Sequence, residues 1–93
     1  MKRGDWFLYV VECSDGTLYA GIATDVTRRL REHNSSLKGA KYTRSRRPVN
    51  LIYWTDFSDR AAACKAEAKF KKLSRKRKLE VINESDLGGL TFI

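Results

Sequence analysis

Hydrophobic and polar residues change their spacing several times along this chain, and each change predicts an element of secondary structure. The stretch WFLYVVEC is rich in aromatic and β-branched residues and stops at SDGT, where Ser14, Asp15 and Gly16 favour a turn. LYAGIA follows directly, so residues 6–23 are expected to form a β-hairpin. Farther along, NLIYWTDF predicts a third strand.

The segment after the hairpin predicts a helix from about Val26 to His33, with Thr24 or Asp25 as its N-cap. Between this helix and the third strand lies a basic stretch that contains the only proline of the chain and is expected to be irregular. These elements place two strands, one helix and a loop before the third strand.

The pattern after the third strand is helical. SDRAAACKAEAKFKKL combines strong helix formers with a capping residue near Ser58. Ser74 is suited to cap a further short helix that carries Leu79 and Ile82, whereas the tail LGGLTFI is too short and rich in glycine to assign. The element order β-β-α-β-α-α predicts an α+β fold, with one domain over residues 1–83 and a C-terminal tail over 84–93.

Composition narrows the class of protein. The 93 residues are 42% hydrophobic and 32% charged, as in an ordinary folded domain near the small end of the size range. No apolar run approaches the ~20 residues of a membrane span, and the N-terminus lacks the hydrophobic region of a signal peptide, so a cytoplasmic protein is expected. Cys13 and Cys64 are far apart and are interpreted as small buried hydrophobic residues.

Charge indicates a polyanionic partner. Nineteen Lys and Arg residues against 11 Asp and Glu give a net charge of +8, concentrated in KGAKYTRSRR and KFKKLSRKRK. Such runs are most often solvated surface, but here aromatic residues lie among the charges, which favours contact with phosphates. The residues assigned to nucleic-acid binding are Lys38, Lys41, Tyr42, Arg44, Arg46, Arg47, Lys71 and Lys72.

Helical geometry separates the residues of the first helix. At about 100° per residue, Val26 and Leu30 form an apolar stripe, and Arg29 and His33 fall just beside it. Arg28, Arg31 and Glu32 fall on the far side, toward water. Arg29 and His33 are thus placed on the wall of a cleft, or, alternatively, serve only to cover the edge of the core.

The same geometry isolates one carboxylate on the later helix. Glu67 lies at the edge of the apolar stripe that contains Ala63 and Phe70, and four lysines surround it in the sequence. One interpretation is a surface ion pair with Lys71, four residues later. The other is an oxygen ligand for a divalent cation, since Mg²⁺ commonly takes one or two carboxylates and completes its shell with water and phosphate oxygens.

Taken together, five positions resemble the signature of the GIY-YIG nuclease superfamily, in the same order and at fitting spacings. They are Tyr9, Tyr19-Ala20-Gly21, Arg29, His33 and Glu67. The resemblance covers nearly the whole chain and is greatest to the small stand-alone bacterial members called YhbQ-like, through DVTRRLREHN, KGAKYTRSRRPV and LSR. The first motif reads Phe-Leu-Tyr and the second Tyr-Ala-Gly, so only the tyrosines and the glycine are retained literally.

The resemblance implies a role for each matching residue. Glu67 is expected to hold a single Mg²⁺ or Mn²⁺ ion, and Arg29 to hold the scissile phosphate with its fork of donors. Tyr9 or Tyr19 is expected to accept the proton of the attacking water, although the same tyrosines on strands are also explained by ring packing alone. His33 would orient a tyrosine or relay the proton, and Gly21 would let the backbone approach closely.

The expected protein is an α+β domain with a three-stranded antiparallel sheet flanked by helices, which acts as a metal-dependent endonuclease. DNA is favoured over RNA as the substrate, and a monomer is expected, with a protein partner for targeting. Two alternatives remain: a nucleic-acid-binding module of the same fold without useful turnover, and a protein-interaction domain whose basic face serves solubility. Binding alone needs the lysines but not Glu67, which favours the enzyme.

Overall fold

Three strands and four helices make up the part of the chain that the computed structural model describes, residues 5–35 and 38–92. The side chains beyond residue 84 are not described, and the ends of the predicted segments 1–83 and 84–93 fall partly outside these ranges. In chain order the elements are β1 (Trp6–Glu12), β2 (Leu18–Ala23), α1 (Val26–Ser35), α2 (Lys41–Arg44), β3 (Asn50–Phe57), α3 (Arg60–Lys71) and α4 (Arg75–Phe92).

The sheet is antiparallel with the strand order β2-β1-β3, so β1 is central and the other two strands are edges. The predicted hairpin is confirmed, and its turn places Gly16 at φ +84°, a conformation that favours glycine. A register shift between Val10 and Val11 marks an irregularity in the pairing of β1 with β3. The predicted α+β class and three-stranded antiparallel sheet are thus confirmed.

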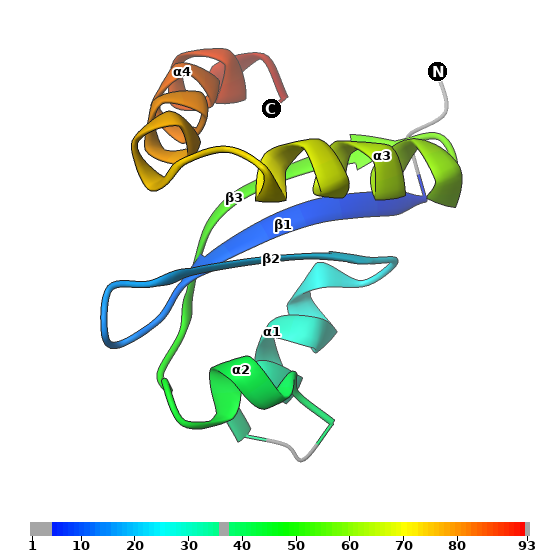
Figure 1. The fold of residues 1–93 in the computed structure, drawn as a ribbon. Helices are drawn as coiled ribbons and strands as arrows, with labels where there is room; N and C mark the ends of the chain where they lie inside the picture. The colour runs from blue at the N-terminus through cyan, green and yellow to red at the C-terminus, as the bar shows by residue number, and fades with distance from the viewer. Residues whose placement is uncertain (1–4, 36–37, 93) are drawn as a thin grey trace.

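Alternation along β1 separates two layers of core, one on each face of the sheet. Leu8 and Val10 point to one face, where they pack with Phe70 of α3 and Ile82 of α4. Tyr9 and Val11 belong to a second cluster, on the face that α1 covers. Figure 1 shows this division, with α3 and α4 on one side of the sheet and α1 and α2 on the other.

Polar caps fix where three of the helices begin. The carboxylate of Asp25, rather than Thr24, accepts a hydrogen bond from the backbone N–H of Arg28 at 2.9 Å. Asp59 caps α3 in the same way, by accepting from Ala62 N–H at 2.8 Å. The predicted Ser74 cap is confirmed as well, since its hydroxyl accepts from a backbone N–H of α4 at 3.2 Å.

The structure departs from the expected elements in two places. The basic stretch predicted as irregular contains α2, a single turn that is too short to produce a periodic hydrophobic pattern. The helix after Ser74 was expected to be short, but α4 continues through most of the glycine-containing tail, as far as Phe92. Two adjacent glycines reduce helix propensity by about 1 kcal/mol each, so local sequence favours an earlier end.

Within the described residues, none of the helices has the length and hydropathy that a membrane span requires. Both cysteines are free thiols, Cys13 buried and Cys64 half-buried. Burial raises the pKa of the Cys13 thiol above its ordinary value, which keeps it neutral. These observations agree with the interpretation of Cys13 as a small buried residue of the core, whereas Cys64, interpreted in the same way, is only half-buried.

Candidate active site

Gly21 and Tyr9 form a cross-strand pair between β2 and β1. A Cβ atom on Gly21 would lie 2.7 Å from the Tyr9 hydroxyl oxygen and 2.9 Å from the adjacent ring carbon. The Tyr9 ring therefore lies directly over Gly21 and extends toward the edge strand β2. Gly21 was expected to allow a close approach of the backbone. In the structure the space that its missing side chain leaves is filled by the ring of Tyr9.

His33 is completely buried at the centre of this face, and not at the edge of the core as the helical wheel predicts. The difference arises because α1 is covered by the sheet and also by the segment that contains α2. A Cβ on Gly39 would lie 2.6 Å from the carbonyl oxygen of Glu32 and 2.8 Å from His33 Cα, so this segment packs directly on the α1 backbone. The segment that contains α2 thus covers α1 on a second side. It buries the His33 side chain, which would lie at the edge of the core if α1 packed on the sheet alone.

A chain of hydrogen bonds runs through His33. The Tyr9 hydroxyl lies 2.7 Å from His33 Nε2, and Thr43 Oγ1 lies 3.0 Å from Nδ1. Thr43 in turn donates to the carbonyl of Ala40 at 2.9 Å. Thr43, like His33, has no exposed surface, and Tyr9 is 2% exposed. Sequence reasoning did not identify Thr43, because a single threonine in a basic segment carries no periodic or motif signal.

Burial sets the protonation states in this chain. Desolvation, with a smaller effect from Tyr19, raises the pKa of Tyr9 to about 12, although Arg29 opposes the rise. Desolvation and the positive charge of Arg29 lower the pKa of His33 to about 4. At neutral pH the pair is therefore a protonated phenol and a neutral imidazole, so Tyr9 in this state is a poor base.

Tyr19 stands at the border of the buried cluster and is half-buried. Its ring packs edge-to-face on His33, with centroids 5.4 Å apart, and stacks on Tyr42 at 5.8 Å. The Arg46 guanidinium lies 4.0 Å from the centroid of Tyr42 and is held there by an ion pair with Asp15 at 3.1 Å. A continuous series of ring and guanidinium contacts thus connects the buried His33 with the surface.

Arg29 leaves α1 on the side of the tyrosine cluster. Its Nη1 donates to Glu32 at 2.9 Å and to the carbonyl of Lys38 at 2.6 Å. Burial opposes its charge, but hydrogen bonding with Glu32 and Tyr9 raises the pKa of Arg29 above its ordinary value. Arg28 and Arg31 are exposed, as the wheel predicts, which makes Arg29 the arginine of this helix that borders the cluster.

Glu32 was expected on the solvated face, but it is half-buried because it pairs with both Arg28 and Arg29. The hydrogen bond from Arg29 holds the pKa of the Glu32 carboxyl below its usual value. The carboxylate therefore orients Arg29, a role that the wheel did not assign.

Glu67 lies on α3 and makes the ion pair with Lys71 that the sequence offered as one interpretation, at 3.1 Å. Its negative charge also contributes to the raised pKa of Tyr9, which places the carboxylate within electrostatic reach of the phenol. Among the described residues, no three His, Cys, Asp or Glu side chains are grouped as metal ligands. A cation at Glu67 would therefore have at most two such side chains as ligands, and water or substrate oxygens would complete its shell.

The predicted nucleic-acid-binding residues divide into two groups. Exposed side chains belong to Lys38, Lys41, Tyr42, Arg44, Lys71 and Lys72. Arg46 and Arg47 are half-buried and have other partners: Arg46 pairs with Asp15, and Arg47 donates to the carbonyls of Glu32 and His33. Arg47 thereby satisfies backbone acceptors near the C-terminal end of α1, which is a structural role.

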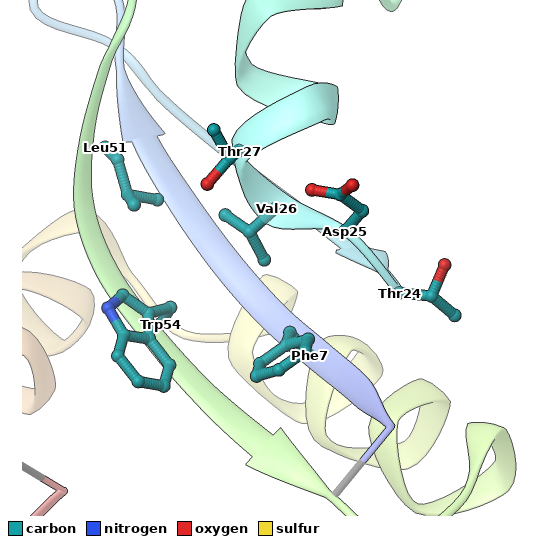
Figure 2. Close-up of a pocket in the computed structure, with 7 residues that line it drawn as sticks. All are labelled: Phe7, Thr24, Asp25, Val26, Thr27, Leu51 and Trp54. Atoms are coloured by element: carbon teal, nitrogen blue, oxygen red, sulfur yellow. The ribbon is translucent and has the colours of Figure 1, made fainter.

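A cavity of about 430 Å³ lies on the same face of the sheet but toward the other edge strand (Figure 2). Phe7 and Trp54 line it from the sheet, and their rings meet edge-to-face with centroids 5.9 Å apart. Val26 and Thr27 line it from the first turn of α1. None of the signature residues lines this cavity, so the candidate site is the tyrosine and histidine cluster near β2 and not the cavity.

Comparison with known proteins identifies the family of this chain. Residues 5–80 match the model of the GIY-YIG catalytic domain. The chain is 54% identical over 86 residues to UPF0213 protein DP2720 of Desulfotalea psychrophila. The aligned region covers 92% of this chain and 78% of that protein. It is 48% identical over 85 residues to UPF0213 protein lin0209 of Listeria innocua, with 91% and 93% covered.

Two solution NMR structures have a similar fold. The protein EF2693 of E. faecalis aligns with a TM-score of 0.62 and 47% identity, over 94% of this chain and 90% of that one. The UPF0213 protein BH0048 of Bacillus halodurans aligns with a TM-score of 0.56 and 41% identity, over 84% and 82%. Because the family model matches residues 5–80 and the relatives are about half identical over most of the chain, the chain belongs to the GIY-YIG family.

Proposed function

We propose that this protein is a metal-dependent endonuclease that hydrolyses phosphodiester bonds, with DNA favoured over RNA. The observation that carries the proposal is the cluster that Tyr9, Tyr19, Arg29 and His33 form beside β2. Glu67 comes from α3, which packs on the other face of the sheet, and acts on Tyr9 through its charge alone. Phosphodiester hydrolysis needs an activated water, a cation and a donor for the phosphate. The cluster contains candidates for the base and for the phosphate donor, and Glu67 of α3 is the candidate for holding the cation.

Arg29 is the proposed phosphate donor. Glu32 and the Lys38 carbonyl both bind Nη1, which fixes the plane of the guanidinium. We assign the scissile phosphate to its remaining N–H groups, whose fork geometry matches two phosphate oxygens. The side chain is 28% exposed, so an incoming phosphate has access while the charge stays partly desolvated.

Glu67 is the proposed ligand of a single Mg²⁺ or Mn²⁺ ion. A lone carboxylate fits Mg²⁺, which keeps several waters and takes further oxygens from the substrate phosphate. When bound, such an ion supplies neutralisation of the charge that develops on the phosphate and a lower pKa for a coordinated water. Lys71 would have to release Glu67, and because the lysine side chain is 53% exposed this costs little.

Tyr19, rather than Tyr9, is the proposed proton acceptor. Tyr9 is buried and its phenol has a pKa of about 12, so it is held in the neutral form. Tyr19 is half-buried on the edge strand, where solvent and substrate have access. Tyr9 and His33 then serve to hold Tyr19 in place.

The exposed cations form the surface proposed to bind the phosphate backbone. Lys38, Lys41 and Arg44 lie on or beside α2, which covers α1 next to the cluster. Each phosphate that they neutralise contributes to affinity through counterion release, without reading sequence. As further parts of the proposal, the protein acts as a monomer in the cytoplasm and relies on a protein partner for targeting.

Cleavage of labelled single-stranded, duplex and branched DNA, and of matching RNA, with and without Mg²⁺ or Mn²⁺, tests the proposal. Glu67→Gln keeps the shape of the side chain but removes its charge, so cleavage should fall by on the order of 10²- to 10³-fold while binding persists. Arg29→Ala should lose cleavage to a similar extent. The controls are Glu84→Gln and Arg31→Ala, two exposed positions that should retain wild-type rates.

The outcomes separate the alternatives. Full activity in Glu67→Gln would refute the assignment of Glu67 as a metal ligand. The ion pair with Lys71 would then be the role of Glu67 that remains. Binding of nucleic acid by the wild-type protein, with no cleavage of any substrate, would instead identify a binding module. Absence of both would favour the protein-interaction domain.

A further inference from the structure

The buried chain Tyr9–His33–Thr43 contains one residue, Thr43, that none of the family positions accounts for. Thr43 belongs to α2, outside the strands and helices that carry the signature, yet it has no exposed surface and its hydroxyl lies 3.0 Å from His33 Nδ1. Among the described residues, every buried side-chain nitrogen and oxygen has a hydrogen-bond partner. The chain is thus a satisfied polar network inside the core, where a lost partner is costly.

Counting donors and acceptors determines where the protons lie. A neutral imidazole has one N–H and one acceptor nitrogen. The Thr43 hydroxyl donates its single proton to the Ala40 carbonyl at 2.9 Å, so toward His33 the Thr43 oxygen acts as an acceptor. Nδ1 then carries the imidazole proton, and Nε2 is left to accept from the Tyr9 hydroxyl at 2.7 Å.

The opposite tautomer has a weaker set of partners. With the proton on Nε2, Nδ1 would accept from Ala40 N–H at 3.3 Å, or from the Thr43 hydroxyl at 3.0 Å if that hydroxyl gave up its bond to the Ala40 carbonyl. The Tyr9 hydroxyl would then receive the Nε2 proton, and its own proton would lose His33 as an acceptor in a site that is 2% exposed. Ala40 is only half-buried, so water can reach its N–H more readily than the phenol. The Nδ1–H tautomer leaves the Ala40 N–H without its bond to His33, and this costs less than leaving the buried Tyr9 hydroxyl proton without an acceptor.

We propose that Thr43 is a positioning residue that holds His33 in the Nδ1–H tautomer and, through it, fixes Tyr9 and Tyr19. His33 contacts both tyrosines: its Nε2 accepts from Tyr9, and its ring packs edge-to-face with Tyr19 at 5.4 Å. Rotation or inversion of the imidazole would move both. The inference deepens the proposed nuclease function, because Tyr19 is the group assigned to the attacking water.

The position of Thr43 links the basic segment to the site. Gly39 permits the close approach of this segment to α1, and the Arg29 guanidinium donates to the Lys38 carbonyl at 2.6 Å. The same short stretch therefore offers exposed cations to the backbone of a nucleic acid and holds the imidazole from within. The position of this segment therefore fixes both Arg29, the proposed phosphate donor, and, through His33, the two tyrosines.

Nuclear magnetic resonance tests the tautomer directly, because His33 is the only histidine of the chain. Correlation of the two ring nitrogens with the ring protons at pH 7.5, where the ring is neutral, distinguishes Nδ1–H from Nε2–H. We expect Nδ1–H in the wild-type protein and in Thr43→Ser, which keeps the hydroxyl. Thr43→Val keeps the shape but removes the acceptor, and should shift His33 to Nε2–H. Thr27→Val, at an exposed threonine of α1, should change nothing.

Cleavage kinetics provide the second readout. Thr43→Val should lower kcat on the order of ten- to a hundredfold with little change in KM, because misplaced reacting groups cost rate more than binding. Thr43→Ser should keep most of the wild-type kcat, and circular dichroism should show that each variant is folded. An Nε2–H tautomer in the wild-type protein, or wild-type tautomer and kcat in Thr43→Val, would overturn the inference. Absence of cleavage by the wild-type protein refutes the nuclease function alone, since the tautomer is read without substrate.

Discussion

The single buried histidine makes the stability of this protein depend on pH in a calculable way. His33 has no exposed surface, and burial with the nearby Arg29 charge lowers its pKa to about 4, against an ordinary 6.5. In the unfolded chain the ring binds a proton below pH 6.5, whereas in the folded protein it stays neutral down to about pH 4. The unfolded state therefore gains protons first, and stability falls as the pH drops through this window.

The magnitude follows from the two pKa values. The contribution is fully present above pH 6.5 and declines by up to about 1.4 kcal/mol per pH unit below it. By pH 4.5 the free energy of unfolding should be lower by about 2.5 kcal/mol from His33 alone. The hydrogen bonds that hold the pKa of Asp15 and Glu32 below the usual carboxyl range act at lower pH, so the interval from 6.5 to 4.5 reports mainly on the histidine.

Urea unfolding followed by circular dichroism at half-unit steps from pH 7.5 to 4.5 measures this decline. His33→Gln removes the titrating ring, so its stability should vary far less across the same interval, even if the variant is less stable throughout. The comparison uses the slopes and not the absolute values. A wild-type curve that stays flat to pH 5, or an equal slope in His33→Gln, would refute the argument that burial keeps this ring neutral.

Two further predictions address the packing and the basic surface. Gly21→Ala places a Cβ 2.7 Å from the Tyr9 hydroxyl, so it should destabilise the fold by about 1–3 kcal/mol in urea unfolding, and an unchanged midpoint would contradict the packing described. Arg47→Ala should lower stability by about 1 kcal/mol by removing donors to the α1 carbonyls, with Arg44→Ala as the matched control that keeps wild-type stability. In binding to a fluorescent oligonucleotide, Arg44→Ala should reduce the log-log salt slope by about one, and an equal loss of slope in Arg47→Ala would contradict the division of these arginines.

Local sequence determined the elements whose signals lie within a few residues. The hairpin follows from two β-rich runs around a turn, and α1, α3 and α4 begin at side chains that cap them. The sequence also determined the family, because its signature is an ordered set of residue types that needs no coordinates to recognise. The exposed positions of Arg28 and Arg31 followed from helical periodicity alone.

Only the tertiary structure decided how the site is enclosed. A helical wheel describes one helix against one surface, so it placed His33 at a margin, whereas α2 adds a second surface and buries it. The same wheel placed Glu32 in water, because an ion pair with Arg29 depends on side-chain positions that periodicity does not contain. Thr43 contacts His33 from ten positions farther along the chain, and such a contact is set by the packing of segments and leaves no local pattern in the sequence.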